Sequence, residues 1–124
     1  MTEVAMQRKY FTRKAGVFFQ SVRSGKELWI KQDRSGKIQR LAGGLHLPRG
    51  KFEELMAEYP SSLLDKTNCL DAEVATELFE DARREKFAGN IEYEDTVIFF
   101  LIKKGPDKYE IGCSSIIERI EEIT

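Results

Sequence analysis

The chain has 124 residues, of which 41% are hydrophobic and 33% are charged, a composition too apolar for a disordered protein. Its length suits one domain with a modest core or two very small lobes. The charge is divided along the sequence: residues 1–51 hold 12 basic and 3 acidic side chains, a net charge of +9, whereas the rest of the chain carries −10. A positive lobe of this kind is typical of polyanion binding, although two lobes that only attract each other would show the same division.

Signals for secretion, membrane insertion and metal binding are missing from the sequence. The longest apolar run, Val97 to Ile102, is far shorter than a membrane span, and the first residues contain no apolar signal core. Cys69 and Cys113 lie far apart in the sequence and do not have the spacing of metal ligands. We expect both to be free thiols in a reducing compartment. We therefore expect an intracellular protein, in the cytoplasm or, in a eukaryote, in the nucleus, with no membrane contact, metal or cofactor.

The first half of the chain is predicted to form a small sheet closed by a helix. Turn residues separate short runs of aromatic and β-branched residues, the pattern of antiparallel strands. The predicted strands cover residues 18–22, 27–32, 37–41 and 45–47, with one further edge strand over residues 8–13. Apolar side chains at helical spacing then predict a helix, and they are Phe52, Leu55, Met56 and Tyr59.

The second half is predicted to contain a helix, two strands and a final helix. An apolar stripe over residues 70–82 predicts the first helix. The continuous apolar run TVIFFLI, within residues 91–104, is typical of a strand buried on both faces, and alternation over residues 109–113 predicts the next strand. Ser115 and Glu118 form a capping box that predicts the last helix. Its inward-facing side chains would be Ile116, Ile117, Ile120 and Ile123.

The order of these elements predicts an α+β fold. An antiparallel sheet of three to four strands closed by a helix is followed by an α-β-β-α segment. We assign residues 7–60 to a basic, β-rich nucleic-acid-binding module and residues 61–124 to an acidic segment. The two would pack as one compact unit or as an intramolecular pseudo-dimer.

The hairpin around residues 24–25 would carry aromatic rings and cations on one exposed face. A two-residue turn pairs Gln20 with Trp29 and Phe18 with Lys31, so these four side chains share a face. Unpaired bases stack on such rings while cations follow the phosphates, which favours single strands over duplex. The alternative is that Trp29 and Phe18 are buried against the second half. The opposite face, which suits a core, would carry Phe19, Ser21, Leu28 and Ile30.

The predicted nucleic-acid contacts are basic, aromatic and amide side chains of the first half. They are Arg13, Lys14, Phe18, Gln20, Arg23, Lys26, Trp29, Lys31, Arg34, Lys37 and Arg40. Catalysis has little support, because His46 is the only histidine and has no nucleophile at a recognisable spacing. We therefore expect no enzymatic activity and no catalytic residue.

One stretch of the chain resembles a known family. Residues 35–56, SGKIQRLAGGLHLPRGKFEELM, resemble the closing segment of the positive cofactor four family of transcriptional coactivators and single-stranded DNA-binding proteins, with Gly36, residues 44–47, Phe52 and Leu55 at matching spacing. Upstream, FFQSVRSGKELWIK resembles the first hairpin of that family. The resemblance covers about residues 17–57, under half of the chain.

The resemblance implies a curved antiparallel sheet, dimerisation through the helix and single-stranded DNA lying over the strands. Lys26, Lys37 and Arg40 would be the inherited contacts. The chain departs from the family in a loop poorer in lysine, at residues 41–43, and in the position of Trp29 inside a strand. The order of strands and helix is also similar to that of Pur-alpha repeats and, more remotely, of Whirly proteins.

The sequence as a whole predicts a protein that binds single-stranded nucleic acid, with DNA favoured over RNA, as a transcription or replication accessory factor. It would act as a homodimer or as an intramolecular pseudo-dimer. The alternative is a protein-interaction module, such as a phage or host regulator, whose acidic second half binds a protein partner.

Overall fold

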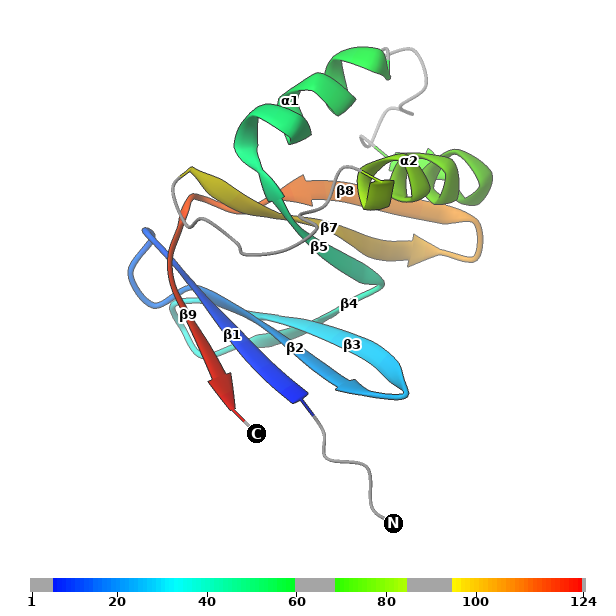
Figure 1. The fold of residues 1–124 in the computed structure, drawn as a ribbon. Coiled ribbons are helices and arrows are strands. Elements are labelled where there is room, and N and C mark those ends of the chain that lie inside the picture. Colours follow the sequence, from blue (N-terminus) through cyan, green and yellow to red (C-terminus); the bar gives the residue numbers. More distant parts are fainter. Residues whose placement is uncertain (1–5, 60–68, 85–94, 124) are drawn as a thin grey trace.

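The computed structural model describes residues 6–59, 69–84 and 95–123. These residues form two antiparallel sheets and two helices, so the predicted α+β class is confirmed. One sheet has five strands (sheet A) and the other has four (sheet B). Figure 1 shows that sheet B lies between sheet A and the pair of helices. Neither of the helices in the described part of the chain is long and apolar enough to cross a membrane.

Sheet A is built mainly from the start of the chain and is completed by its end. Its strands, in spatial order, are β4 (Ile38–Leu41), β3 (Lys26–Gln32), β2 (Phe18–Ser24), β1 (Met6–Thr12) and β9 (Ile117–Ile123). The strand predicted over residues 8–13 exists as β1, but its prediction as an edge strand is wrong because β9 pairs with its free side. A cross-strand ion pair between Arg8 and Glu122, 2.8 Å, accompanies that pairing.

Sheet B contains the most apolar strand of the chain at its centre. Its strands, in spatial order, are β5 (Gly43–Pro48), β7 (Thr96–Gly105), β8 (Lys108–Cys113) and β6 (Cys69–Asp71). The strand predicted over residues 45–47 therefore belongs to sheet B and not to the first sheet, because the chain crosses over at Ala42 and pairs with β7. The three-residue strand β6 was not predicted.

Two helices, α1 (Arg49–Glu58) and α2 (Ala72–Arg84), cover one face of sheet B. Both were predicted from their apolar spacing. Leu55 of α1 and Leu78 and Phe79 of α2 are buried in the same cluster as Phe99 of β7. The helix that the family resemblance assigns to dimerisation thus packs on sheet B of its own chain.

Strand β7 is buried on both faces, as its continuous apolar run predicts. Phe99 belongs to the cluster beneath the helices, whereas Ile98 and Phe100 belong to a second cluster between the two sheets. Because sheet B lies in the middle layer, the side chains from Thr96 to Leu101 meet another layer whichever way they point. The position of sheet B in the fold therefore explains the composition of β7.

The end of the chain is a strand, so the helix predicted after Ser115 is wrong. Residues 117–123 form β9 and pair along β1, and the predicted capping box is absent. Ile117 is buried and Ile120 packs at the edge of the same cluster, but Ile123 is 43% exposed. The open side of β1 offers this segment a full set of backbone hydrogen bonds, which outweighs its weak helical spacing.

The two halves of the sequence exchange strands. β9, from the acidic half, completes sheet A, while β5 and α1, from the basic half, belong to the sheet B side of the molecule. The predicted division into residues 7–60 and 61–124 therefore does not coincide with the two sheets. The basic loops and strands nevertheless remain on sheet A.

Candidate nucleic-acid interface

The outer face of sheet A, the face turned away from sheet B, is covered by none of the described elements (Figure 1). Strand register groups its side chains into rows that cross the sheet. Row one, beside the β1–β2 and β3–β4 loops, contains Arg119, Phe11, Phe18, Gln32 and Ile38. Row two contains Glu121, Lys9, Gln20, Ile30 and Arg40. Row three contains Ile123, Gln7, Val22 and Leu28.

Row one has two neighbouring aromatic rings at its centre. The ring centroids of Phe11 and Phe18 are 5.6 Å apart, and both side chains are half-buried. The guanidinium of Arg119 lies 4.2 Å from the Phe11 centroid, and the ammonium of Lys9 lies 5.4 Å from the Phe18 centroid. Each ring therefore has a cation beside it, the combination on which unpaired bases stack.

The outer face also exposes large aliphatic side chains. Leu28, Ile38 and Ile123 are 46%, 60% and 43% exposed. The solvated face of an antiparallel sheet normally carries polar side chains, and apolar groups gathered on it with rings and cations mark a surface that binds something.

Seven of the predicted contact residues lie on this face or in the two loops beside row one. Phe18, Gln20 and Arg40 are on the outer face. The other four are exposed loop cations, namely Arg13, Lys14, Arg34 and Lys37. Arg23 and Lys26 lie at the opposite end of the sheet, where β2 turns into β3, and are separated from this group.

The prediction that Trp29 shares a face with Phe18 and Gln20 is wrong. Ser24 pairs with Lys26 around Gly25 alone, which has a φ of +86°, so Trp29 pairs with Ser21 instead of Gln20. A shift of one residue moves every side chain of a strand to the other face. Trp29 and Lys31 therefore point toward sheet B, whereas Leu28 and Ile30, predicted as core, lie on the outer face.

Trp29 is a core residue, only 4% exposed. Its ring stacks on Tyr10, with centroids 5.4 Å apart, and lies against the backbone of Gly44. A Cβ at position 44 would come within 2.5 Å of the indole, so this glycine makes the space that the ring fills. The alternative that Trp29 is buried is thus the correct one.

Three outer-face residues, Lys9, Phe11 and Arg119, escaped the sequence-based prediction. Alternation along the strand predicted over residues 8–13 would have placed Lys9 and Phe11 on one face. Arg119 had no such signal, because its segment was expected to be helical.

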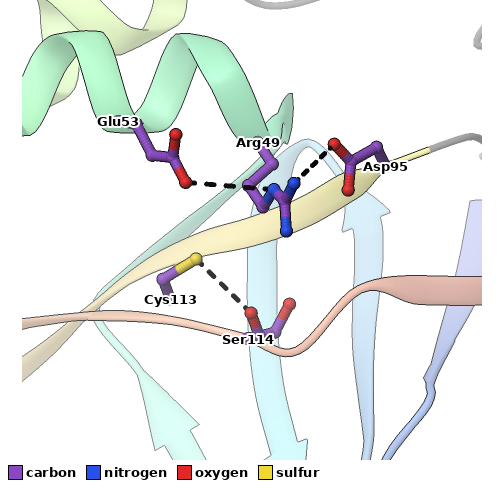
Figure 2. Close-up of polar contacts among 5 residues, drawn as sticks. All are labelled: Arg49, Glu53, Asp95, Cys113 and Ser114. Atoms are coloured by element: carbon purple, nitrogen blue, oxygen red, sulfur yellow. Dashed lines mark hydrogen bonds and ion pairs between the residues drawn. The ribbon is translucent and has the colours of Figure 1, made fainter.

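Acidic side chains gather on the helical layer, the layer farthest from sheet A (Figure 1). The exposed glutamates of α1 and α2 are Glu53, Glu54, Glu58, Glu73, Glu77 and Glu80. Arg49, at the start of α1, lies 3.9 Å from Glu53 and 3.1 Å from Asp95, and Figure 2 shows its guanidinium between the two carboxylates. Its charge is therefore neutralised within the protein, unlike that of the loop cations on sheet A.

His46 is buried between the two sheets. Its Nε2 lies 2.7 Å from Oγ1 of Thr96, and its ring packs against Tyr10. Burial, with the charge of Arg8 nearby, lowers the pKa of the imidazole to about 4. The described residues contain no group of three or more histidine, cysteine or acidic side chains placed to hold a metal ion.

Comparison of the chain with protein-family models, with curated proteins and with solved structures finds no match. The resemblance to the positive cofactor four family therefore stays a prediction, and the functional argument rests on the geometry of sheet A.

Proposed function

We propose that the protein binds single-stranded nucleic acid across the outer face of sheet A, along row one. The observation that carries this proposal is the pair of neighbouring rings, Phe11 and Phe18, on an uncovered sheet with a cation beside each ring. Stacking of a base on an aromatic side chain contributes roughly 1–3 kcal/mol, whatever the base. Two adjacent rings suit two successive bases.

The loop cations supply the phosphate contacts. Arg13 and Lys14 follow β1, and Arg34 and Lys37 lie between β3 and β4, so both loops border row one. In the part of the chain that the structure describes, none of these four side chains forms an ion pair. Their charges are free to neutralise phosphates and to release the counterions of the strand.

Single strands fit this surface better than duplex. Rings on a sheet reach bases only where the bases are unpaired, whereas duplex readers usually insert a helix into the major groove. The two described helices expose glutamates and lie on the far side of sheet B. They would repel a phosphate backbone.

The test is fluorescence anisotropy with single-stranded and duplex oligonucleotides of both sugars at low salt. Phe18→Leu keeps an apolar side chain and removes the ring, so we expect about a 10-fold rise in Kd with little change in melting temperature. Lys103→Gln, on sheet B and outside the outer face, is the control and should change Kd by less than about twofold. Absence of single-strand binding by the unaltered protein would contradict the proposal.

A second candidate function is protein binding through the helical layer. Its supporting observation is the set of exposed glutamates on α1 and α2, which would complement a basic surface or imitate a nucleic acid. Capture of a partner that survives nuclease treatment and is lost in a Glu73→Gln, Glu77→Gln, Glu80→Gln variant would favour it. Capture that instead requires Lys37 and Arg40 would favour nucleic-acid binding.

A further inference from the structure

A crevice opens between the two sheets at the loop end of sheet A. Its volume is about 570 Å³. The apolar part of its wall is formed by Val17, in the loop before β2, and by Phe19 of β2. The opposite side is formed by Ser114 and Ser115, in the chain between β8 and β9. The crevice is large enough for a nucleotide and is lined by apolar and polar groups together.

Three cations line this crevice: Lys14, Lys31 and Arg34. Lys31 comes from the inner face of β3, and its ammonium lies 5.6 Å from the ring centroid of Phe100 and 6.0 Å from that of Phe19. Lys14 and Arg34 approach from the two loops, which touch where Gly16 meets Arg34. Among the described residues, none of the three cations has a carboxylate partner within ion-pair distance.

The one carboxylate in the lining, Asp33, is engaged by its own turn. Its Oδ1 accepts hydrogen bonds from the Ser35 backbone N–H at 2.9 Å, the Ser35 hydroxyl at 2.6 Å and the Lys37 backbone N–H at 2.9 Å. The Ser35 hydroxyl and these backbone donors hold the pKa of Asp33 below its usual value. The crevice therefore keeps an excess of positive charge, with Asp33 fixing the loop that carries Arg34.

A second hollow of about 400 Å³ lies next to the crevice. It shares Lys31 and Asp33 with the crevice and is also lined by Ile38 and Arg40, which belong to rows one and two. Its lining residues Ile38, Gln39 and Arg40 belong to β4, the edge strand of sheet A. A strand lying along row one can thus bend around that edge into the crevice.

We propose that the crevice binds a phosphate monoester carried by a nucleotide, and that its source is the terminal phosphate of a single strand held on the outer face. A monoester is close to dianionic at neutral pH and presents three terminal oxygens, which suits a crevice lined by three cations better than a diester does. Val17 would contact the sugar or base. The choice of a strand terminus as the source depends on the function proposed above; the chemistry of the crevice does not.

The test compares oligonucleotides of one sequence with a 5′-phosphate, a 3′-phosphate or hydroxyls at both ends. We expect one phosphorylated form to bind at least 10-fold more tightly than the hydroxyl form. Lys31→Met keeps the side-chain stem against Phe100 and removes the charge, so it should abolish the difference while leaving the hydroxyl form bound as before. Lys103→Gln, which removes an exposed charge outside the crevice, should preserve the difference.

Alkylation of Cys113 supplies a readout that does not depend on binding affinity. Cys113 is one of the residues lining the crevice and is exposed, and Figure 2 shows it beside Ser114, whereas Cys69 is buried and serves as an internal reference. Burial raises the pKa of Cys113 to about 11, so labelling is done at alkaline pH with excess maleimide. The phosphorylated oligonucleotide should slow labelling of Cys113 severalfold, and its hydroxyl form should not.

The outcomes of these two experiments distinguish failure of the crevice proposal from failure of the outer-face proposal. Equal affinities for all three oligonucleotides, without protection of Cys113 by any phosphate compound, would overturn the crevice assignment and leave the outer-face proposal standing. Protection by a nucleoside monophosphate, with equal oligonucleotide affinities, would support a phosphomonoester site and overturn the strand terminus as its source. Loss of binding to every oligonucleotide together with protection by the monophosphate would overturn the outer-face proposal alone.

Discussion

Sheets A and B differ in how many of their faces are packed. In β7 of sheet B, six successive side chains from Thr96 to Leu101 are buried, whereas in β3 of sheet A only Trp29 is. Sheet B lies between two layers, and sheet A contacts only one. Packing therefore determines the residues of sheet B, while the rings, cations and aliphatic groups on the outer face of sheet A require another explanation, and ligand binding supplies it.

The largest expected effect is a difference in stability between variants of two neighbouring residues of β3, Trp29 and Leu28. Trp29→Ala empties a position in the core between the sheets, and we expect it to lower the free energy of unfolding by about 3–5 kcal/mol. Leu28→Ala acts on the uncovered face and should cost less than about 1 kcal/mol. Urea denaturation followed by circular dichroism measures both, and equal losses would mean that the two faces of sheet A are packed alike.

Burial between the sheets should also make stability depend on pH through His46. The folded protein lowers the pKa of His46 from 6.5 to about 4, so between these values the unfolded chain binds the additional proton. Stability from this group is complete above pH 6.5 and is lost progressively down to pH 4, by up to about 3 kcal/mol. Arg8 and the Tyr10 ring are its neighbours, and both disfavour the imidazolium form by charge or burial.

The check for His46 is the difference between two pH profiles of unfolding free energy. His46→Gln should have a shallower slope than the unaltered protein between pH 4 and pH 6.5, although its stability at pH 7 is also lower. Parallel profiles would show that His46 titrates normally and is therefore solvated.

An added methyl group should change the stability of the protein in opposite directions at Gly44 of sheet B and at Gly50 of the helical layer. Gly44→Ala drives a Cβ to 2.5 Å from the Trp29 indole, and we expect a loss of about 1–3 kcal/mol from overpacking. Gly50→Ala, in α1, meets nothing within 4 Å and should raise stability by up to about 1 kcal/mol. Thermal melting of the two variants distinguishes them, and a neutral Gly44→Ala would place the Trp29 ring elsewhere.

The smallest expected effect concerns single loop cations. Lys37→Gln should reduce the magnitude of the slope of log Kd against log salt concentration by about 0.7, the value for one phosphate contact on a single strand. Lys103→Gln removes the same charge from sheet B and should leave the slope unchanged. Equal changes of the slope in the two variants would indicate that the nucleic acid is attracted by the net charge of the protein and not bound along a defined surface.

The sequence predicted correctly those elements whose hydrophobic pattern repeats along their whole length. The apolar run of β7 and the stripe of α2 were sufficient because each is repeated over several residues. The β2–β3 register was mispredicted, since it depends on whether one or two residues form the turn at Gly25, and that parity decides the face of Trp29. The last segment, IIERIEEI, suits either helix or strand, and pairing with β1 decides the outcome.

The candidate site was predicted in part for the same reasons. Phe18 and the loop cations depend on local sequence alone, and the structure places them together. Phe11 and Arg119 become neighbours only through pairing of the two ends of the chain, a contact between distant residues that no local pattern contains.

The most direct measurement of nucleic-acid binding on sheet A is an NMR titration of the isotopically labelled protein with a short single-stranded oligonucleotide. We expect the shift changes to concentrate on rows one and two, around Phe11 and Phe18, and on the loops of Lys14 and Arg34. The amides of α1 and α2 should stay unchanged. Changes centred on the two helices, or no changes at low salt, would contradict the proposal that the uncovered face of sheet A binds single strands.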